Sequence, residues 1–276
     1  MTSYMRYSPR AIARYQPEKI LSTNNNSQVI LCFDTITKNM VVLKILLKQN
    51  TPEPDFTLRM STKRDSITVL DIIKDTSADV LILEHVKHGA LFDYVVDRKI
   101  DILLAIRLIN PILRIVDELH SMKYVHRDIK LENILLNEDQ TVLTDYEFVT
   151  KVTKKLMISE CGSPHYASPE VILSEEHDLY KSDIYSIGIV LYAILLQKLP
   201  FSFKTYDDLA IAVLADFPFP DRFNPKLRSI IEEMTNKKIE LRPSIREIWK
   251  KLYEVYVVET ITLHGDSYAM LKLHLL

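Results

Sequence analysis

Short apolar runs dominate the first third of the chain, and longer helical periodicities dominate the rest. Runs rich in Val, Ile and Leu predict strands over residues 28–33, 39–45, 66–73 and 80–83. One helix is predicted among them, from Pro52 to Arg64 with Thr51 as its cap. Later periodicities predict helices over residues 101–122, 182–197, 205–215, 225–235 and 243–256. We therefore expect an α+β fold with a small sheet-rich lobe before a larger helical lobe.

The change of pattern near residues 84–89 suggests how the chain is divided. We expect an N-terminal extension over 1–14, a small lobe with its connection over 15–86, a large lobe over 87–256 and a tail over 257–276. A cleft where two lobes meet is a common place for a ligand. The fairly apolar tail is expected to dock back on the domain, with partner binding as the alternative.

Composition narrows the classes of function. The 276 residues carry a formal net charge of −2, so a nucleic-acid partner, which needs a clustered positive excess, is not expected. The longest apolar stretch, 184–196, is interrupted by polar residues and too short to cross a bilayer, so no membrane partner is expected either. Two cysteines, Cys32 and Cys161, suit a reducing compartment. We expect a monomeric protein of the cytoplasm or nucleus.

The stretch HRDIKLEN, followed at a distance by Asp145, carries the strongest chemical signal. Asp128 can deprotonate a substrate hydroxyl, and Lys130 can neutralise charge on a transferring phosphoryl group. Asn133 and Asp145 supply the oxygen ligands that magnesium prefers. Each residue alone has an ordinary structural explanation, such as capping a turn or closing a loop, but together they indicate phosphoryl transfer from a magnesium nucleotide.

With further motifs in order, residues 15–255 resemble the eukaryotic protein kinase family. VVLK ends in Lys44, DYE at 145–147 stands where the family has DFG, and SPE at 168–170 stands where it has APE. The resemblance extends to a central helix with Asp183, Tyr185 and Gly188, and to an arginine, Arg242, that pairs with Glu170. It implies the two-lobed kinase fold, ATP and Mg²⁺ as cofactors, and Lys44 on the α- and β-phosphates.

Lys130 and the string GSPHYASPE are typical of serine/threonine kinases rather than tyrosine kinases. CGSPHYASPEVI most resembles the calcium/calmodulin-dependent group, in its AMP-activated-kinase-like branch. The activating phosphosite of that branch falls on Ser159, where an upstream kinase would act and the phosphate would pair with Arg127. An ordinary solvated loop serine is the alternative.

The resemblance also implies an adenine pocket. Leu83 takes the gatekeeper position, while the Glu84 carbonyl and the Val86 amide would bond the adenine edge. Val29, Val42 and Leu135 would sandwich the ring, although membership of an ordinary apolar core would also explain these three residues.

The glycine-rich loop of the family lacks its glycines here. Ser22, Asn24 and Ser27 occupy the three glycine positions in STNNNSQV. Glycine lets backbone amides approach phosphate in conformations that other residues resist, and asparagine tolerates such conformations better than most. We expect these residues to contact the phosphates. We also expect the chain to bind nucleotide more weakly than kinases that keep the loop glycines.

Two carboxylate positions also depart from the family. Its register places Asp55 opposite Lys44, with Glu53 nearby as the alternative, and the shorter aspartate suggests a pair that forms only if the helix moves inward. A plain N-terminal helix carboxylate is an equal alternative. Glu147 replaces the DFG glycine, and it either points to solvent or shares a metal with Asp145.

The sequence therefore predicts a serine/threonine kinase that transfers the ATP γ-phosphoryl group to protein substrates. A pseudokinase, which binds but does not catalyse, is the alternative that the lost glycines and Glu147 favour. A small-molecule phosphotransferase is disfavoured because residues 145–170 resemble a platform for protein substrates. Glu132 and Asp207 suggest a basic element in the substrate, yet Ala90 replaces another acid that related kinases use.

Overall fold

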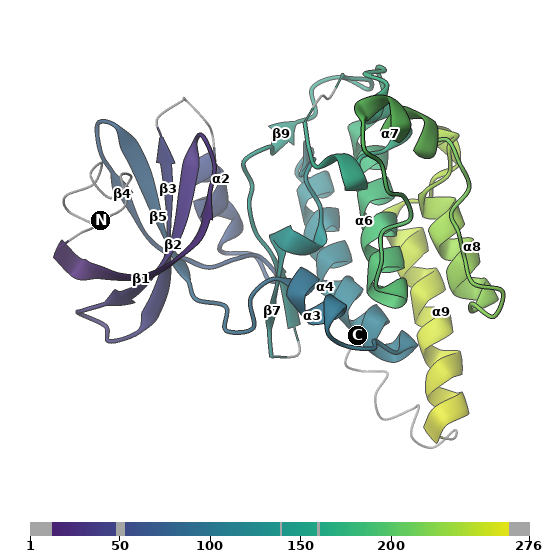
Figure 1. Cartoon of the computed structure of the whole chain (residues 1–276), viewed down its shortest axis with the longest axis horizontal. Coiled ribbons are helices and arrows are strands. Elements are labelled where there is room, and N and C mark those ends of the chain that lie inside the picture. The colour runs from purple at the N-terminus through teal and green to yellow at the C-terminus, as the bar shows by residue number, and fades with distance from the viewer. Residues whose placement is uncertain (1–12, 48–52, 139, 159–160, 265–276) are drawn as a thin grey trace. The chain divides into compact units, whose positions relative to one another are not determined.

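The computed structural model describes residues 13–47, 53–138, 140–158 and 161–264. It divides into two compact units (Figure 1). The first comprises Met1–Lys87 with Thr144–Glu147, and the second comprises His88–Leu143 with Phe148–Leu276. The short segment 144–147 therefore packs with the sheet-rich unit although it lies far away in the sequence. The combination of an antiparallel sheet unit and a helical unit confirms the predicted α+β class.

The first unit is built on one antiparallel sheet of five strands in the order β1-β2-β3-β5-β4. One helix, α2, lies between β3 and β4 in the sequence. The bounds are β1 Tyr15–Thr23, β2 Ser27–Asp34, β3 Met40–Leu47, α2 Glu53–Met60, β4 Val69–Lys74 and β5 Ala78–Glu84.

The two faces of this sheet have different environments. One face carries the core cluster of Tyr15, Ile30, Cys32, Val41, Leu43, Ile45, Ala78, Val80 and Ile82. Side chains alternate along a strand, so Val42 and Lys44 of β3 lie on the opposite face. Cross-strand pairing places Val29 opposite Lys44 and Leu83 opposite Val42, on that same second face. The residues predicted for nucleotide binding in these three strands therefore share one face.

The hydrophobic pattern missed β1 as a separate strand. Nearly all of β1 is exposed, and it contains Pro17 and two register irregularities. An edge strand tolerates proline and needs no apolar face, so it leaves a weak periodic signal. The prediction also began β4 three residues early and ended the helix at Arg64 instead of Met60. Its cap Thr51 and first residue Pro52 lie outside the described residues.

Helices α4, α6 and α9 lie side by side in the second unit (Figure 1). The short β7–β8 and β6–β9 pairs were not predicted. The bounds are α3 Leu91–Val96, α4 Ile102–Ser121, β6 Tyr124–Val125, η2 Leu131–Asn133, β7 Ile134–Asn137, β8 Gln140–Leu143, β9 Thr150–Lys151, η3 Pro164–Tyr166, α5 Pro169–Ile172, α6 Leu179–Leu196, α7 Tyr206–Ala212, α8 Pro225–Met234, η4 Ile239–Leu241 and α9 Ile245–His264. Helix α9 continues eight residues beyond its predicted end.

Helix α6 is the central apolar element of the second unit. By length and composition alone it could span a membrane, but most of its residues are buried inside the protein. A Cβ atom added at Gly188 would lie 2.7 Å from Thr235 Cγ2 and 3.1 Å from Met234 Cβ. The glycine therefore lets α6 approach the end of α8 more closely than any larger residue would allow.

Candidate active site

The Lys44 ammonium lies at the centre of a buried charge cluster in the first unit. Its Nζ atom donates to Glu53 Oε1 at 2.5 Å and to Asp145 Oδ1 at 2.7 Å. Lys44 is 6% exposed, and burial alone would lower the pKa of its ammonium. The Asp145 and Glu53 carboxylates outweigh burial and raise that pKa. The structure thus brings together the predicted phosphate-binding lysine and the predicted metal-binding aspartate.

The expectation that Asp55 pairs with Lys44 is wrong, and the alternative, Glu53, is the partner. Asp55 instead forms an exposed pair with Lys74, at 2.9 Å. Two residues along a helix turn a side chain by about 200°, so these two carboxylates of α2 face opposite ways. The pair is already formed here with the longer glutamate side chain, so no inward helix movement is needed to make it.

Glu147 does not simply face solvent. It is half-buried, and its carboxylate can place one oxygen within 4.8 Å of ligand oxygens from Glu53 and Asp145. Burial, followed by the charges of Asp145 and Glu147, raises the pKa of Glu53 to about 7 although Lys44 acts to lower it. Lys44 thus bonds Glu53 and Asp145, and the Glu147 carboxylate adds a further negative charge close to these two.

This donor set fits a hard divalent cation such as Mg²⁺. Carboxylate oxygens are the ligands that Mg²⁺ and Ca²⁺ prefer. Glu53 Oε2 is buried and has no hydrogen-bond partner among the described residues, which is costly unless a further positive group comes near it. Asp145 also has φ of 66°, a left-handed backbone conformation that is often found at functional sites.

Tyr146 stands where DFG has phenylalanine, and its hydroxyl is accommodated. Its ring is fully buried and packs against Phe56, with centroids 5.8 Å apart. The hydroxyl lies 2.7 Å from Ser66 Oγ. A buried hydroxyl needs such a partner, so Ser66 explains why the extra oxygen is tolerated. Sequence reasoning gave no role to Ser66, and only the tyrosine at this position could have suggested one.

The three residues at the glycine positions lie in or beside the turn between β1 and β2. Ser22 pairs with Val29 across the hairpin, and Asn24 and Ser27 bound the turn itself. Ser27 is buried, and its hydroxyl donates to Asn24 Oδ1 at 3.1 Å. Their predicted contact with phosphate stays a prediction.

The predicted adenine-binding residues occupy the expected strands. Leu83 and Val86 are buried, and Val42 is half-buried on the Lys44 face of the sheet. The Glu84 side chain accepts a bond from the Thr68 amide at 3.0 Å. Leu135 lies in β7 of the second unit and forms a bridge with Ala90. Their contacts with adenine stay a prediction.

Asp128 is held by a compact set of donors in the second unit. Lys130 Nζ donates to Asp128 Oδ2 at 2.7 Å and to Ser163 Oγ at 2.8 Å. The Ser163 hydroxyl donates to Asp128 Oδ1 at 2.9 Å, and Asn133 Nδ2 donates to Asp128 Oδ2 at 2.9 Å. The structure therefore brings together the predicted base Asp128, the cation Lys130 and the amide of Asn133. It adds Ser163, which was not predicted to contact Asp128 although it lies in the GSPHYASPE string.

The side-chain nitrogen of Asn133 donates to Asp128, so the side-chain oxygen of Asn133 is the atom that would ligate a metal. Asn133 Nδ2 also donates to the Asp128 carbonyl at 2.9 Å. These two bonds fix the orientation of the Asn133 side-chain amide at the end of the short helix η2. The prediction that Asn133 and Asp145 hold one magnesium ion, and that Lys44 and Asp128 serve one nucleotide, stays a prediction.

Asp183 of α6 supports the backbone that leads into Asp128. Its carboxylate accepts from the amides of His126 and Arg127, each at 2.9 Å, and from His120 Nε2 at 3.0 Å. Burial would raise the pKa of Asp183, but these donors, with His120 the strongest, hold it below its usual value. An ionised Asp183 thus positions the loop, and φ of 67° at Arg127 shows how sharply that loop turns.

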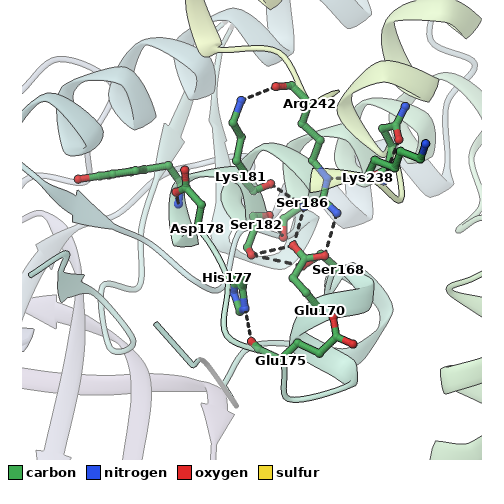
Figure 2. A network of polar contacts seen from close by, with 12 residues as sticks. Ser168, Glu170, Glu175, His177, Asp178, Lys181, Ser182, Ser186, Lys238 and Arg242 are labelled. Atoms are coloured by element: carbon green, nitrogen blue, oxygen red, sulfur yellow. Dashed lines mark hydrogen bonds and ion pairs between the residues drawn. The ribbon is translucent and has the colours of Figure 1, made fainter. Parts of the chain in front are cut away.

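Glu170 and Arg242 form the second buried charge cluster (Figure 2). Arg242 donates through both terminal nitrogens, to Glu170 Oε1 at 2.6 Å and Oε2 at 2.8 Å. Ser182 donates to Glu170 Oε1 at 3.1 Å, and Lys181 Nζ bonds the Arg242 carbonyl. Ser168, which stands where APE has alanine, adds a 3.3 Å bond to Ser182. The predicted pair is confirmed as the centre of a network between α5, α6 and the end of η4.

The remaining predictions concern regulation and substrate choice. Ser159, the predicted phosphosite, lies outside the described residues. Arg127 Nε donates to the Phe148 carbonyl at 2.6 Å, so its guanidinium is already oriented. Glu132 and Asp207 are exposed, as substrate-contacting acids must be, and Ala90 is half-buried.

Comparisons with known proteins place this geometry in a family. The protein kinase domain family matches residues 15–253. The chain is similar to carbon catabolite-derepressing protein kinases, with 32% identity over 255 residues to that of Saccharomyces cerevisiae and 31% over 255 residues to that of Candida glabrata. Each match covers 86% of this chain, and 39% and 41% of those relatives.

A probable serine/threonine-protein kinase of Dictyostelium discoideum is 30% identical over 217 residues, which cover 77% of this chain and 26% of that relative. The chain thus spans between about a quarter and two fifths of the length of these relatives. The family match covers most of the chain and includes both charge clusters and the Asp128 loop. This chain belongs to the protein kinase domain family.

Proposed function

We propose that this chain is a serine/threonine protein kinase that transfers the γ-phosphoryl group of ATP to hydroxyl groups of protein substrates. The observation that carries the proposal is the Asp128 carboxylate, bonded by Lys130, Asn133 and Ser163 at 2.7 to 2.9 Å. A carboxylate oriented by three donors can accept a hydroxyl proton in one fixed direction. The similarity to a relative named as a probable serine/threonine-protein kinase supports the same proposal.

Each residue of the proposed site has a distinct role. Asp128 orients the substrate hydroxyl and takes its proton, while Lys130, beside it, neutralises negative charge that develops on the phosphoryl group. Lys44 contacts the α- and β-phosphates and is kept cationic by Glu53 and Asp145. Magnesium, held by Asp145 and Asn133 oxygens, would neutralise phosphate charge.

The preference for aliphatic hydroxyls rests on Lys130 and Ser163. Their side chains contact each other at 2.8 Å, and both contact the Asp128 carboxylate. Lys130 and the string that contains Ser163, GSPHYASPE, are typical of kinases that act on serine and threonine. The similarity to carbon catabolite-derepressing kinases supports a place near the AMP-activated-kinase-like group. We also propose an intracellular location, in the cytoplasm or nucleus.

The alternative, a pseudokinase that binds nucleotide without catalysis, rests on the missing loop glycines and on Glu147. Despite both departures, Lys44 bonds Asp145, and Asp128 bonds Lys130 and Asn133. We therefore favour catalysis over binding alone.

The test is transfer of labelled γ-phosphate from MgATP to serine, threonine and tyrosine peptides by the purified chain. Asp128→Asn should lower the rate by about 10²–10⁴-fold, the range that general acid–base catalysis contributes. The exposed Asp221→Asn serves as the matched control and should leave the rate within about twofold, as expected of surface changes. Equal rates in the native chain and Asp128→Asn, with both proteins folded, would overturn the proposal.

A further inference from the structure

The turn between β1 and β2 is closed by the side chain of Asn24. Its amide donates to the Ser27 carbonyl at 2.9 Å, as in an ordinary hairpin turn. Its carboxamide oxygen, Oδ1, accepts from the Asn26 amide at 2.9 Å, from the Ser27 amide at 2.6 Å and from the Ser27 hydroxyl at 3.1 Å. One side-chain oxygen thus engages two successive backbone amides and a hydroxyl.

Successive backbone N–H groups that converge on one point form an anion-binding concavity. In this turn the two amides and the hydroxyl converge on an oxygen of the same chain. The Asn24 carboxamide oxygen therefore stands in for the phosphate oxygen that such a loop would otherwise meet. Glycine, which the family has at this position, carries no side chain that could do the same.

We propose that the Asn24 side chain competes with the phosphates of ATP for the amides of Asn26 and Ser27, and so determines how tightly this chain binds nucleotide. The inference rests on the proposed function, because it assumes that ATP is the ligand of this loop. A phosphate oxygen is charged and forms stronger hydrogen bonds than a neutral carboxamide. ATP can therefore displace Asn24, but part of its binding free energy is lost in doing so.

A purely structural role for Asn24 leads to the opposite expectation. If Asn24 only stiffened the hairpin, its removal would loosen the turn and weaken nucleotide binding or leave it unchanged. If Asn24 competes with phosphate, its removal frees two backbone amides and the Ser27 hydroxyl, and it strengthens binding of ATP. Adenosine has no phosphates, so its affinity should not respond to the freed donors. The ratio of the two affinities therefore separates the two roles.

Three single variants of the full chain test the inference. Asn24→Ala removes the acceptor without adding glycine flexibility, and Asn24→Asp keeps an acceptor but adds a negative charge. Asn25→Ala is the matched control, because it makes the same chemical change one residue away.

The first measurement needs no nucleotide: amide hydrogen exchange at Asn26 and Ser27. We expect exchange at both amides to accelerate by about tenfold in Asn24→Ala and to stay near native in Asn24→Asp and Asn25→Ala.

The second measurement is calorimetric titration with MgATP and with adenosine. Asn24→Ala should bind MgATP about tenfold more tightly than the native chain, with adenosine affinity within about twofold. Asn24→Asp should bind MgATP at least about threefold more weakly, because its charge repels phosphate. Asn25→Ala should stay within about twofold of native for both ligands.

Failure of this inference differs from failure of the proposed function. If Asn24→Ala and the native chain bind MgATP equally, or if Asn25→Ala produces the same gain, the inference is overturned and the kinase proposal stands. If Asn24→Ala binds more tightly but no variant transfers phosphate, the inference stands and the kinase proposal fails. If no protein binds MgATP, both fail.

Discussion

Two buried glutamates of this chain, Glu170 and Glu53, have side-chain pKa values that shift in opposite directions. Both oxygens of Glu170 accept hydrogen bonds from the Arg242 guanidinium. Glu53 accepts one bond from Lys44, and its second oxygen has no hydrogen-bond partner among the described residues. Burial acts to raise the pKa of both carboxyls, yet the pKa of Glu170 falls below its usual value while that of Glu53 rises to about 7.

The difference shows that burial alone does not decide whether a buried carboxylate is ionised. The number and geometry of its hydrogen-bond donors also decide it. The planar fork of an arginine satisfies both oxygens at once, whereas a lysine is a point charge, here shared with Asp145. The Arg242 guanidinium satisfies both oxygens of Glu170 and is suited to holding α5, α6 and the end of η4 together. The Lys44 cluster leaves Glu53 Oε2 without a hydrogen-bond partner among the described residues, and it is suited to receiving a ligand. Four predictions test this contrast.

The largest effect is expected on removing the arginine. Arg242→Met should lower the free energy of unfolding by about 3–5 kcal/mol, because it leaves Glu170 buried without its charge partner. It also removes the bonds from Arg242 to the Asn236 and Lys181 carbonyls. Urea unfolding at pH 7 measures the loss.

Arg246→Met is the matched control for this change. The Arg246 side chain is 83% exposed and lies 3.8 Å from Asp117, so its removal should cost less than about 0.5 kcal/mol. Similar losses in the two variants would mean that the Glu170 network contributes no more than a surface pair.

Removing the lysine should cost less than removing the arginine. Lys44→Met at pH 6 should lower the free energy of unfolding by about 1–3 kcal/mol, because Glu53, with a pKa of about 7, is already mostly protonated at this pH and the partly exposed Asp145 stays in contact with water. The measurement is urea unfolding of Lys44→Met and Arg242→Met under the same conditions.

Lys74→Met controls for the loss of a lysine, since Lys74 and its partner Asp55 are both exposed. A loss in Lys44→Met that equals or exceeds the loss in Arg242→Met would show that the Lys44 cluster is as complete as the Glu170 cluster.

The contrast also marks the limit of prediction from sequence. The buried strands β2 and β3 of the first unit were predicted because their Val, Ile and Leu runs record burial, whereas exposed β1 left no such signal. The Glu170–Arg242 pair and the residues around Asp128 could be predicted because their motifs have fixed spacing.

The partner of Lys44 was predicted only as the alternative, because the family register placed Asp55, and not Glu53, opposite the lysine. Glu53 and Asp55 differ by about 200° in direction, so a small register error exchanges a buried carboxylate for an exposed one. Ser66 and Ser163 were missed for another reason. A serine gives no periodic signal, and its role here depends on residues that lie far away in the sequence.

The third prediction concerns pH. Glu53 has a folded pKa of about 7, above the usual value of 4.5, so its protonated form is favoured by folding. The stability that it contributes is present below pH 4.5 and is lost as pH rises to 7. Glu53→Gln should remove this loss, so the unfolding free energy of the variant minus that of the native chain should increase by about 1–2 kcal/mol between pH 4.5 and 7.

Glu170→Gln should follow the opposite trend. The pKa of Glu170 is lowered, so its contribution is present above pH 4.5 and is lost as pH falls through the lowered value. The cost of Glu170→Gln should therefore be largest near neutral pH and diminish in acid. Urea unfolding across pH 4 to 8 measures both variants, and parallel curves would contradict the contrast between the two glutamates.

The smallest effect is expected at Glu147. Its charge contributes less than burial, Lys44 or Asp145 to the pKa of Glu53. Glu147→Gln should therefore move the pH midpoint of the Glu53-dependent stability change toward acid by about half a pH unit. The measurement is the same pH series, repeated in the Glu147→Gln background with and without Glu53→Gln, so that only the part that depends on Glu53 is compared. An unchanged midpoint would mean that water screens the charge of Glu147 from Glu53. A shift of several pH units would mean that Glu147, and not burial, is the main cause of the raised pKa of Glu53.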